Sequence, residues 1–267
     1  MNGSDADKLA FYLLKKVNKA IRDCCLIDEG DRVAVAVSGG KDSLSLLRLL
    51  RARQRSALET YELVALHVQD QRDEATALDG QDERLENLEG WVQQEGVEVH
   101  LLELAIGEEE PRPLGCFRCS WHRRKTLFRA AHALGCRKLA LGHHADDLAQ
   151  TALLNLFHHG RLETKKARRA FFGGEVVVIR PLIHVPEKDL VRFARACGFP
   201  VSAGCCTQAA DSQRQKMRDL LRAVQRDTPR ARVNLLRAVE RCRDVAGGLE
   251  EQAPDLPCSA ESASAPS

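Results

Sequence analysis

The chain has 267 residues, ten cysteines and a formal net charge of +2 at pH 7. This length is enough for one or two domains with a full hydrophobic core. Because no run of 18 apolar residues occurs and the first residues are polar, we expect neither a membrane span nor a signal peptide. Ten cysteines without an export signal indicate reduced thiols, which we expect in the cytoplasm.

Apolar runs that suit strands buried on both faces alternate with segments of helical spacing through most of the chain. The expected strands are 32–37, 63–68, 97–104, 138–141 and 176–179, and the expected helices are 43–54, 81–95, 119–134, 146–158 and 187–197. This alternation predicts an α/β fold with a doubly wound parallel sheet of five strands. Ligands of such sheets bind beyond the carboxyl ends of the strands.

The composition divides the chain into four expected segments. Residues 1–30 form an N-terminal helical segment, and residues 31–211 form the α/β domain. Residues 212–250 read as basic C-terminal helices with a break near Asp227-Thr228-Pro229. Residues 251–267 are rich in Ala, Ser and Pro, which predicts a disordered tail.

A short glycine-containing segment, Ser38-Gly39-Gly40-Lys41-Asp42-Ser43, directly follows the first expected strand and precedes a helix. A phosphate-binding loop needs this order, because glycines allow positive φ and a helix N-terminus offers unpaired N–H groups to an anion. Lys41 adds a cation, and Ser38 and Ser43 add hydroxyls. The segment is not a Walker loop. It resembles the loop of the PP-loop ATP pyrophosphatases, which bind ATP through its pyrophosphate and adenylate a substrate.

Charge is distributed unevenly along the chain. Residues 70–110 carry 14 acidic and 2 basic side chains, whereas residues 111–132 carry 6 basic and no acidic ones and residues 212–243 carry 10 basic and 3 acidic ones. Further basic residues are Arg161, Lys165, Lys166, Arg168 and Arg169. Each stretch alone is compatible with a solvated surface, but three stretches that converge would hold a polyanion, which favours contact with RNA.

Cys116-Phe117-Arg118-Cys119 is a C-x-x-C pair where an expected loop enters a helix. Its spacing lets two thiolates reach one metal and fits half of a zinc site, a redox pair or part of an iron–sulfur site. The redox reading fits poorly because the sheet already carries a nucleotide loop, and a zinc finger would need a second C-x-x-C, which the sequence lacks. Cys205 and Cys206 are adjacent, and neighbours rarely both reach one ion.

Several motifs together resemble TtcA, the tRNA 2-thiocytidine synthetase family. In chain order between residues 31 and 221 they are the C-x-x-C with Ser120, Arg123 and Arg124, then Gly142-His143-His144-Ala145-Asp146-Asp147, Ile179-Arg180-Pro181-Leu182 and Gln213-Arg214-Gln215. The resemblance implies that ATP, with Mg²⁺, adenylates the C2 oxygen of a cytidine, at position 32 of tRNA, and that sulfur then replaces this oxygen. It also implies a [4Fe-4S] cluster whose open iron carries sulfur from a cysteine desulfurase. A homodimer is a compatible assembly.

The resemblance also implies roles for individual residues. The cluster ligands would be Cys116, Cys119 and Cys206, with Cys205 as the rival to Cys206, and the catalytic residues would be Asp42, Arg123 and Asp147. ATP would be bound by Ser38, Gly39, Gly40, Lys41, Asp42, Ser43, His67, Val68, Gly142 and His143. From the charge pattern, we expect RNA contacts at Arg124, Lys165, Lys166, Arg168 and Arg169. We expect His144 to be structural or solvated.

The sequence departs from the resembling family in two places. The family usually has a Met-Pro-Pro segment after Gly160, where this chain has residues 161–170. The family also usually has a further cysteine three positions before the third cluster cysteine, and residues 202–206 lack it. Two other functions therefore stay open. One is a zinc-stabilised RNA-binding protein without ATP turnover. The other is a PP-loop enzyme that thiolates another tRNA base or adenylates a small molecule.

Overall fold

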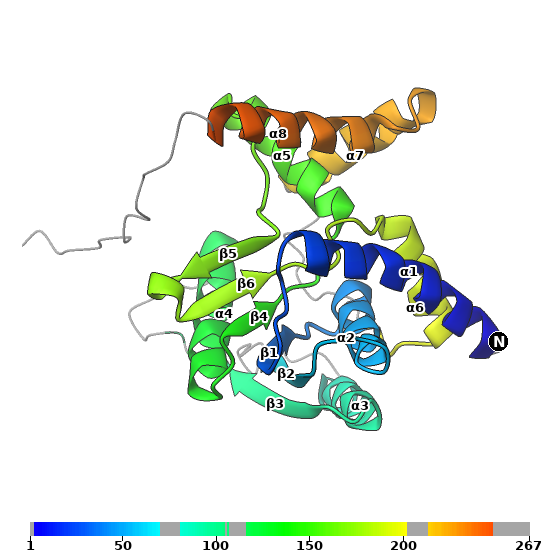
Figure 1. Cartoon of the computed structure of the whole chain (residues 1–267), viewed down its shortest axis with the longest axis vertical. Coiled ribbons are helices and arrows are strands. Elements are labelled where there is room, and N and C mark those ends of the chain that lie inside the picture. Colours follow the sequence, from blue (N-terminus) through cyan, green and yellow to red (C-terminus); the bar gives the residue numbers. More distant parts are fainter. Residues whose placement is uncertain (1–2, 70–80, 105, 107–115, 202–212, 248–267) are drawn as a thin grey trace, which may run out of the picture.

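The computed structural model describes residues 3–69, 81–104, 106, 116–201 and 213–247 (Figure 1). One sheet of six strands lies at its centre, in the order β3-β2-β1-β4-β6-β5. The strands are β1 (Asp31–Ala36), β2 (Tyr61–Gln69), β3 (Glu98–Glu103), β4 (Lys138–Ala140), β5 (Arg168–Phe171) and β6 (Val176–Ile179). Neighbours from β3 to β6 pair in parallel, which confirms the expected α/β fold.

The strand count differs from the expected five because β5 was not expected. It pairs antiparallel with β6 at the edge of the sheet. Its four residues, Arg-Arg-Ala-Phe, show no apolar alternation, and the two arginines are exposed. Charged residues on a short edge strand are a common protection against pairing with another chain. Arg168 and Arg169, which the sequence analysis expected only as RNA contacts, lie on this strand.

Helices cover both faces of the sheet (Figure 1). α1 (Gly3–Asp23), α2 (Lys41–Arg53) and α6 (Glu187–Cys197) pack against one another, and α2 also packs against β1. α3 (Gln81–Gln94) packs against β3, whereas α4 (Cys116–Ala133) contacts β2, β3, β4 and β6. A 3₁₀ turn, η2 (Phe172–Gly174), connects β5 to β6.

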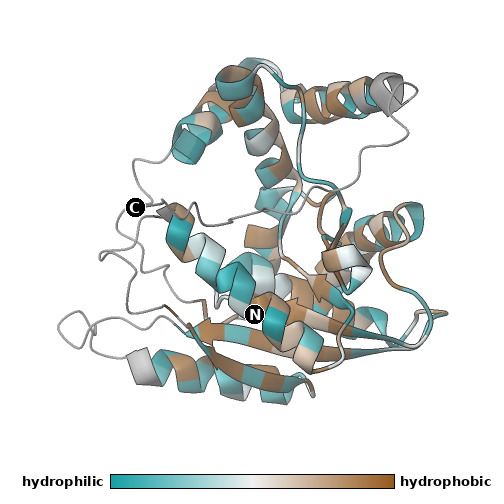
Figure 2. Cartoon of the chain, turned by 90° about the vertical axis from the view of Figure 1, so that its left-hand side faces the viewer, coloured by the Kyte–Doolittle hydropathy of each residue, from teal (hydrophilic) through white to brown (hydrophobic). Residues whose placement is uncertain are grey.

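The core follows from the alternation of side chains along the strands, which point to opposite faces in turn. Val33 and Val35 of β1 pack in the cluster that includes α1, α2 and α6, whereas Ala34 between them packs in the cluster of Phe128 and Ala131 on α4. Side chains on both faces of the parallel strands are thus buried in apolar clusters, and much of the length of the strands is brown in Figure 2. This two-sided burial explains why the strands read as continuous apolar runs in the sequence.

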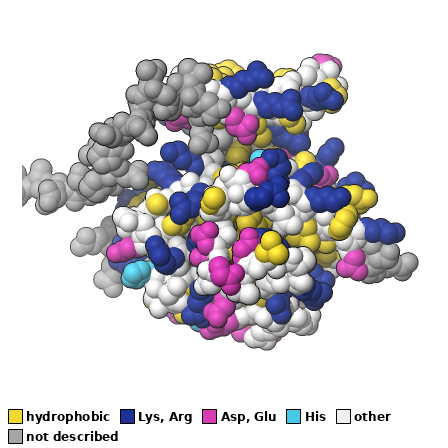
Figure 3. Space-filling model, in the orientation of Figure 1, with side chains coloured by type: hydrophobic (Ala, Val, Ile, Leu, Met, Phe, Trp, Pro, Cys, Tyr) yellow, Lys and Arg dark blue, Asp and Glu magenta, His cyan; other side chains and the backbone are white. Residues whose placement is uncertain are grey.

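The basic C-terminal helices form a separate layer at the top of Figure 1. α7 (Gln213–Asp227) and α8 (Ala231–Gly247) pack against each other and against α5 (Ala145–His159). Lys and Arg side chains gather over this layer (Figure 3). The expected basic helical extension is confirmed, including its break between Asp227 and Ala231. The expected tail, 251–267, lies outside the described residues.

No helix in the described ranges combines the length and apolar character that a membrane-spanning segment requires.

Candidate active site

The expected nucleotide loop lies where the direction of strand order reverses. From β1 the chain adds β2 and β3 on one side of the sheet, and it returns to add β4 and β6 on the other side. The segments that follow β1 and β4 therefore flank the topological switch point, beyond the carboxyl ends of the strands. Ligands of open α/β sheets bind at this point.

The segment Ser38–Ser43 forms a tight loop that leads into α2. The Ser38 N–H donates to Ser43 Oγ at 3.1 Å, and Ser43 Oγ donates to the Gly40 carbonyl at 2.9 Å. Gly39 has φ +78°, a conformation that glycine adopts without strain. Gly40 is the N-cap of α2 and has no side chain to satisfy the first amides of the helix. These amides are available to an anion.

Gly142, in the segment after β4, lies directly against this loop. A Cβ atom at Gly142 would meet the Asp42 carbonyl carbon and the Ser43 nitrogen at 3.1 Å each. Most real Cβ contacts are longer, so any residue other than glycine would push the two backbones apart by a few tenths of an ångström. The expected residues Gly142 and Asp42 are therefore brought together.

Lys41 is held by two carboxylates in the structure. Its Nζ lies 3.0 Å from Asp42 Oδ2 and 3.1 Å from Glu187 Oε1, at the start of α6. Burial lowers the pKa of Lys41, but the two carboxylates outweigh this effect and hold that pKa above its usual value. The ammonium is thus charged and lies at the loop, where phosphate oxygens would compete with Glu187 for it.

Three aspartates surround the buried His144. Its Nε2 lies 3.4 Å from Asp147 Oδ2 and 3.7 Å from Asp42 Oδ2, and its Nδ1 lies 3.8 Å from Asp146 Oδ2. His144 is only 2% exposed. The sequence analysis expected it to be structural or solvated; it is buried rather than solvated, and its ring lies between the two expected catalytic carboxylates. Its position just before the Asp-Asp pair at a helix start was the available signal.

Asp42 carries an unsatisfied buried oxygen. Within the described residues, Asp42 Oδ1 has no hydrogen-bond partner. Burial raises the pKa of this carboxyl, although His144 and Lys41 act in the opposite direction. Within the described residues, no three His, Cys, Asp or Glu side chains are arranged so that they could hold a metal ion by themselves. Asp42 and Asp147 could therefore hold Mg²⁺ only together with phosphate oxygens and waters, which is how Mg²⁺ is usually bound beside nucleotides.

Asp146 connects three helices rather than facing the loop. Its Oδ2 accepts the Glu187 N–H at 2.7 Å, and its Oδ1 accepts from Arg232 Nη1 of α8, also at 2.7 Å. Both side chains of this ion pair are largely buried, with 13% and 14% exposure. Arg232 was not singled out from the sequence, because nothing local links α8 to the start of α5.

The two residues expected beside adenine lie at the end of β2, next to β1. His67 Nδ1 is 2.8 Å from the Val37 carbonyl oxygen, and Val68 is buried. β2 is the neighbour of β1 in the sheet, so both residues lie near the start of the loop. If the phosphates of ATP bind to the loop, the adenine ring can reach His67 and Val68 at the end of β2.

A second group of charged side chains surrounds His143. We call Arg124 of α4, Lys165 before β5, Arg180 after β6 and Arg214 of α7 the inner cationic cluster. Arg180 is buried and Lys165 is half-buried, whereas Arg124 and Arg214 are exposed at the edge of the cluster. Arg180 Nε donates to His143 Nδ1 at 3.3 Å. Burial, with the charges of Lys165, Arg180 and Arg214, lowers the pKa of His143 to about 2. His143 is therefore neutral and, as the acceptor on Nδ1, carries its proton on Nε2.

The expected RNA contacts divide into two groups in the structure. Arg124, Lys166, Arg168 and Arg169 are exposed, whereas Lys165 is half-buried. Burial and the charge of Arg214 lower the pKa of Lys165 to about 8. Lys165 thus lies beside the buried Arg180 and is less exposed than the other expected RNA contacts, whose role stays a prediction.

The expected cluster cysteines are only partly described. Cys119 lies in the first turn of α4 and is half-buried, and Arg123 follows one turn later on the same helix. The side chain of Cys116, and all of Cys205 and Cys206, lie outside the described residues.

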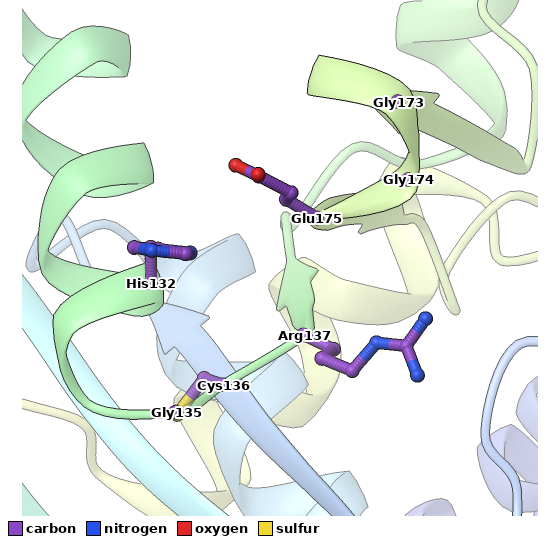
Figure 4. A pocket seen from close by; sticks show the side chains of 7 residues that line it. All are labelled: His132, Gly135, Cys136, Arg137, Gly173, Gly174 and Glu175. Atoms are coloured by element: carbon purple, nitrogen blue, oxygen red, sulfur yellow. The ribbon is translucent and has the colours of Figure 1, made fainter.

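Two surface pockets lie away from these residues. One, of about 430 Å³, is lined by His132, Gly135, Cys136, Arg137 and Gly173–Glu175 (Figure 4). It lies at the amino end of β4, and burial raises the pKa of its Cys136 thiol, so this thiol is poorly nucleophilic. The other, of about 340 Å³, lies at the end of α5 and is lined by Asn155, His159, Arg161 and Glu163. Neither includes an expected ATP-binding residue.

Comparison with known proteins gives consistent results. The family model described as a PP-loop domain matches residues 11–225. A tRNA-cytidine(32) 2-sulfurtransferase of Citrifermentans bemidjiense is 40% identical over 238 residues, or 86% of this chain and 90% of that protein. One of Klebsiella pneumoniae is 39% identical and covers 81% of this chain and 69% of that protein. A solved structure with the same fold is the U34-tRNA thiolase NcsA from Methanococcus maripaludis with its [4Fe-4S] cluster. Its superposition on this chain has a TM-score of 0.71 at 22% identity and covers 90% of this chain and 80% of that chain.

Proposed function

Because this chain belongs to the PP-loop family and, within it, to the tRNA-cytidine(32) 2-sulfurtransferases, we propose that it replaces the C2 oxygen of cytidine 32 in tRNA by sulfur. The chain is an ATP-dependent tRNA sulfurtransferase. The observation that carries the proposal is the SGGKDS loop at the switch point of the sheet, with Gly142 packed against it.

ATP binding is assigned to the loop and the two segments beside it. The free amides at the start of α2 and the ammonium of Lys41 would hold the β- and γ-phosphates, since both favour negative charge. His67 and Val68 would flank the adenine, and His143 would lie near the nucleotide. Ser38 and Ser43 shape the loop through the hydrogen bonds between them.

The activation step makes the C2 oxygen a leaving group. This oxygen attacks the α-phosphorus of ATP, the bond to the β-phosphate breaks, and pyrophosphate leaves. Hydrosulfide then attacks C2, AMP departs with the former C2 oxygen, and the proton of the hydrosulfide is released, so no oxidant or reductant is consumed in this step. Arg123 is assigned to the charge that develops on oxygen, because a guanidinium stays protonated and can bind two oxygens at once. Asp147 is assigned to metal or proton handling.

Two cofactors belong to the proposal. Mg²⁺ would bind at Asp42 and Asp147, supported by the unsatisfied buried Asp42 Oδ1. A [4Fe-4S] cluster would bind at Cys116, Cys119 and Cys206, supported by the C-x-x-C at the start of α4. When bound, such a cluster supplies an iron with an open position for the incoming sulfur. A cysteine desulfurase is the proposed sulfur donor.

The tRNA would contact the basic layer and α4. α7 and α8 carry an excess of arginine, and Lys166, Arg168 and Arg169 are exposed at the sheet edge. On α4, Phe117 is 79% exposed, close to Cys119. Bases of single-stranded RNA loops commonly stack on exposed aromatic rings, so this position suits an anticodon-loop base. We also propose that the chain is divided into an N-terminal segment, an α/β domain and basic C-terminal helices, at residues 1–30, 31–211 and 212–250. The proposed assembly is a homodimer.

A product assay tests the proposal against its alternatives. The anaerobically purified protein is incubated with ATP, Mg²⁺, sulfide and unmodified tRNA, and AMP and pyrophosphate are measured. We expect AMP formation that depends on tRNA. AMP formation without tRNA would point to a small-molecule substrate, and no ATP turnover in a colourless, zinc-containing protein would favour the RNA-binding alternative.

A further inference from the structure

The inner cationic cluster brings basic side chains from separate parts of the chain to one place. Arg180 follows β6, Lys165 precedes β5, and Arg124 and Arg214 come from α4 and α7. Within the described residues, no carboxylate oxygen lies within ion-pair distance of Arg180 or Lys165. Arg180 is 8% exposed, so its guanidinium is buried without a countercharge in contact. Buried charges are normally paired, which makes this arrangement informative.

Arg180 is fixed in position by bonds to its neighbours. Its Nε donates to His143 Nδ1 at 3.3 Å, and its Nη1 donates to the Lys166 carbonyl at 2.6 Å. Its own backbone N–H donates to the Ala167 carbonyl at 2.9 Å. These two side-chain bonds use two of the five N–H donors of a guanidinium, and the others have no described carboxylate to bind. A fixed guanidinium with spare donors is suited to an oxyanion.

The members of the cluster repel one another. Burial, with the charges of Arg124 and Arg169, lowers the pKa of Arg180 to about 10. For Lys165 the repelling charges are Arg214, Arg180 and Arg124, and only Asp147 among the principal neighbours acts in the other direction. A bound anion would relieve this repulsion and favour the charged form of each group.

We propose that the inner cationic cluster is a second phosphate-binding site, separate from the SGGKDS loop, in which Lys165 and Arg180 contact the phosphate and Arg214 of α7 closes the site. His143 joins the two sites, because it contacts Arg180 and directly follows Gly142, which packs against the loop. The ligand is a phosphate ester, carried either by the nucleotide or by the RNA backbone. Only this choice of ligands rests on the proposed function.

Two adjacent lysines provide a matched test. Lys165→Met removes a half-buried ammonium of the cluster, whereas Lys166→Met removes an exposed one from the next position. Affinities for ATP, AMP and unmodified tRNA are measured by titration calorimetry on the full chain, and thermal unfolding checks that both variants fold. We expect Lys165→Met to weaken one of these ligands by about tenfold or more, as for loss of a hydrogen bond to a charged group, and Lys166→Met to weaken it much less.

Chemical labelling gives a readout that does not depend on variants. Lys165, with its lowered pKa, should react with an amine-acylating reagent at pH 8 faster than Lys166 does, and mass spectrometry locates the label. Protection of Lys165 by AMP or ATP alone assigns the site to the nucleotide, and protection by tRNA alone assigns it to RNA. If neither ligand protects Lys165, or if both lysine variants bind all three ligands like the parent, the second phosphate site is wrong.

Failure of this inference can be told apart from failure of the proposed function. Lys41→Ala tests the loop, and its ATP affinity reports on the proposed ATP site alone. Arg214→Gln, at an exposed position of α7, is a second variant that leaves the bond from Arg180 to the Lys166 carbonyl intact. Arg214→Gln should weaken the same ligand as Lys165→Met, and parental binding by both variants would again overturn the site.

Discussion

Replacing Gly142 by Ala tests the packing that positions the ATP loop. The new Cβ would lie 3.1 Å from the Asp42 carbonyl carbon and the Ser43 nitrogen, and 3.2 Å from the Asp42 oxygen. Favourable carbon contacts begin at about 3.5 Å, so one of the two backbones must move by roughly 0.4 Å. All three contacts are with backbone atoms, and no flexible side chain can move aside.

This clash should weaken ATP binding, because it displaces the backbone of the loop that binds phosphate. Overpacking of this kind costs about 1–3 kcal/mol, and each 1.4 kcal/mol lost from binding is about tenfold in Kd. We therefore expect Gly142→Ala to raise the Kd for ATP by about tenfold or more, because the displaced Ser43 N–H belongs to the helix start that binds phosphate. Titration calorimetry with ATP measures this change, and thermal unfolding measures any loss of stability.

Gly90 provides the control for this experiment. It lies in α3, and a Cβ there would meet no atom within 4 Å. Gly90→Ala should raise stability by up to about 1 kcal/mol through helix propensity and leave ATP binding unchanged. If Gly142→Ala binds ATP as tightly as the parent, Gly142 does not set the position of the ATP loop and this reasoning is refuted.

Four further predictions concern single side chains. Lys41→Ala should weaken ATP by about tenfold to a hundredfold by calorimetry without changing the iron content, and unchanged affinity would contradict the loop assignment. Arg232→Ala leaves Asp146 Oδ1 without its cation, so denaturant unfolding should show a loss of about 1–3 kcal/mol, and parental stability would argue against this ion pair. Cys119→Ala should abolish the visible absorption of the anaerobic protein whereas Cys205→Ala should not, and the reverse result would overturn the ligand assignment. Lys165 loses its proton as pH rises through about 8, so the affinity of the parent chain for its phosphate ligand should fall between pH 7 and 9. The affinity of Lys165→Arg should not fall, and identical pH dependences of affinity in the two proteins would contradict the assigned pKa.

The sheet and the loop could be predicted because their signals are local. Strands buried on both faces are apolar throughout, and the SGGKDS loop directly follows one of them. β5 escaped prediction because an edge strand needs little burial, and its Arg-Arg-Ala-Phe sequence reads as a basic surface. Its pairing with β6 depends on the turn at η2 and on the position of the sheet edge, which no local pattern encodes.

The interior charges of the site could not be predicted for a related reason. Lys165 and Lys166 are neighbours of the same type, and only the fold places one of them beside Arg180 and Arg214 and the other in solvent. The pair of Arg232 and Asp146 likewise joins residues 86 positions apart. Residue type and order identified the loop, and the family resemblance identified the Asp-Asp pair, whereas the partners of these residues follow from tertiary packing.

The central claim, thiolation of a tRNA cytidine, is tested most directly by nucleoside mass spectrometry. Transfer RNA is digested from a strain that lacks this gene, from the same strain complemented with the parent chain, and from one complemented with Lys41→Ala. We predict that 2-thiocytidine, located at position 32 by sequencing the anticodon-loop fragment, is absent from the deletion strain, returns with the parent chain and does not return with the variant. If 2-thiocytidine persists in the deletion strain, or if the parent chain restores a different thiolated base, the account is contradicted.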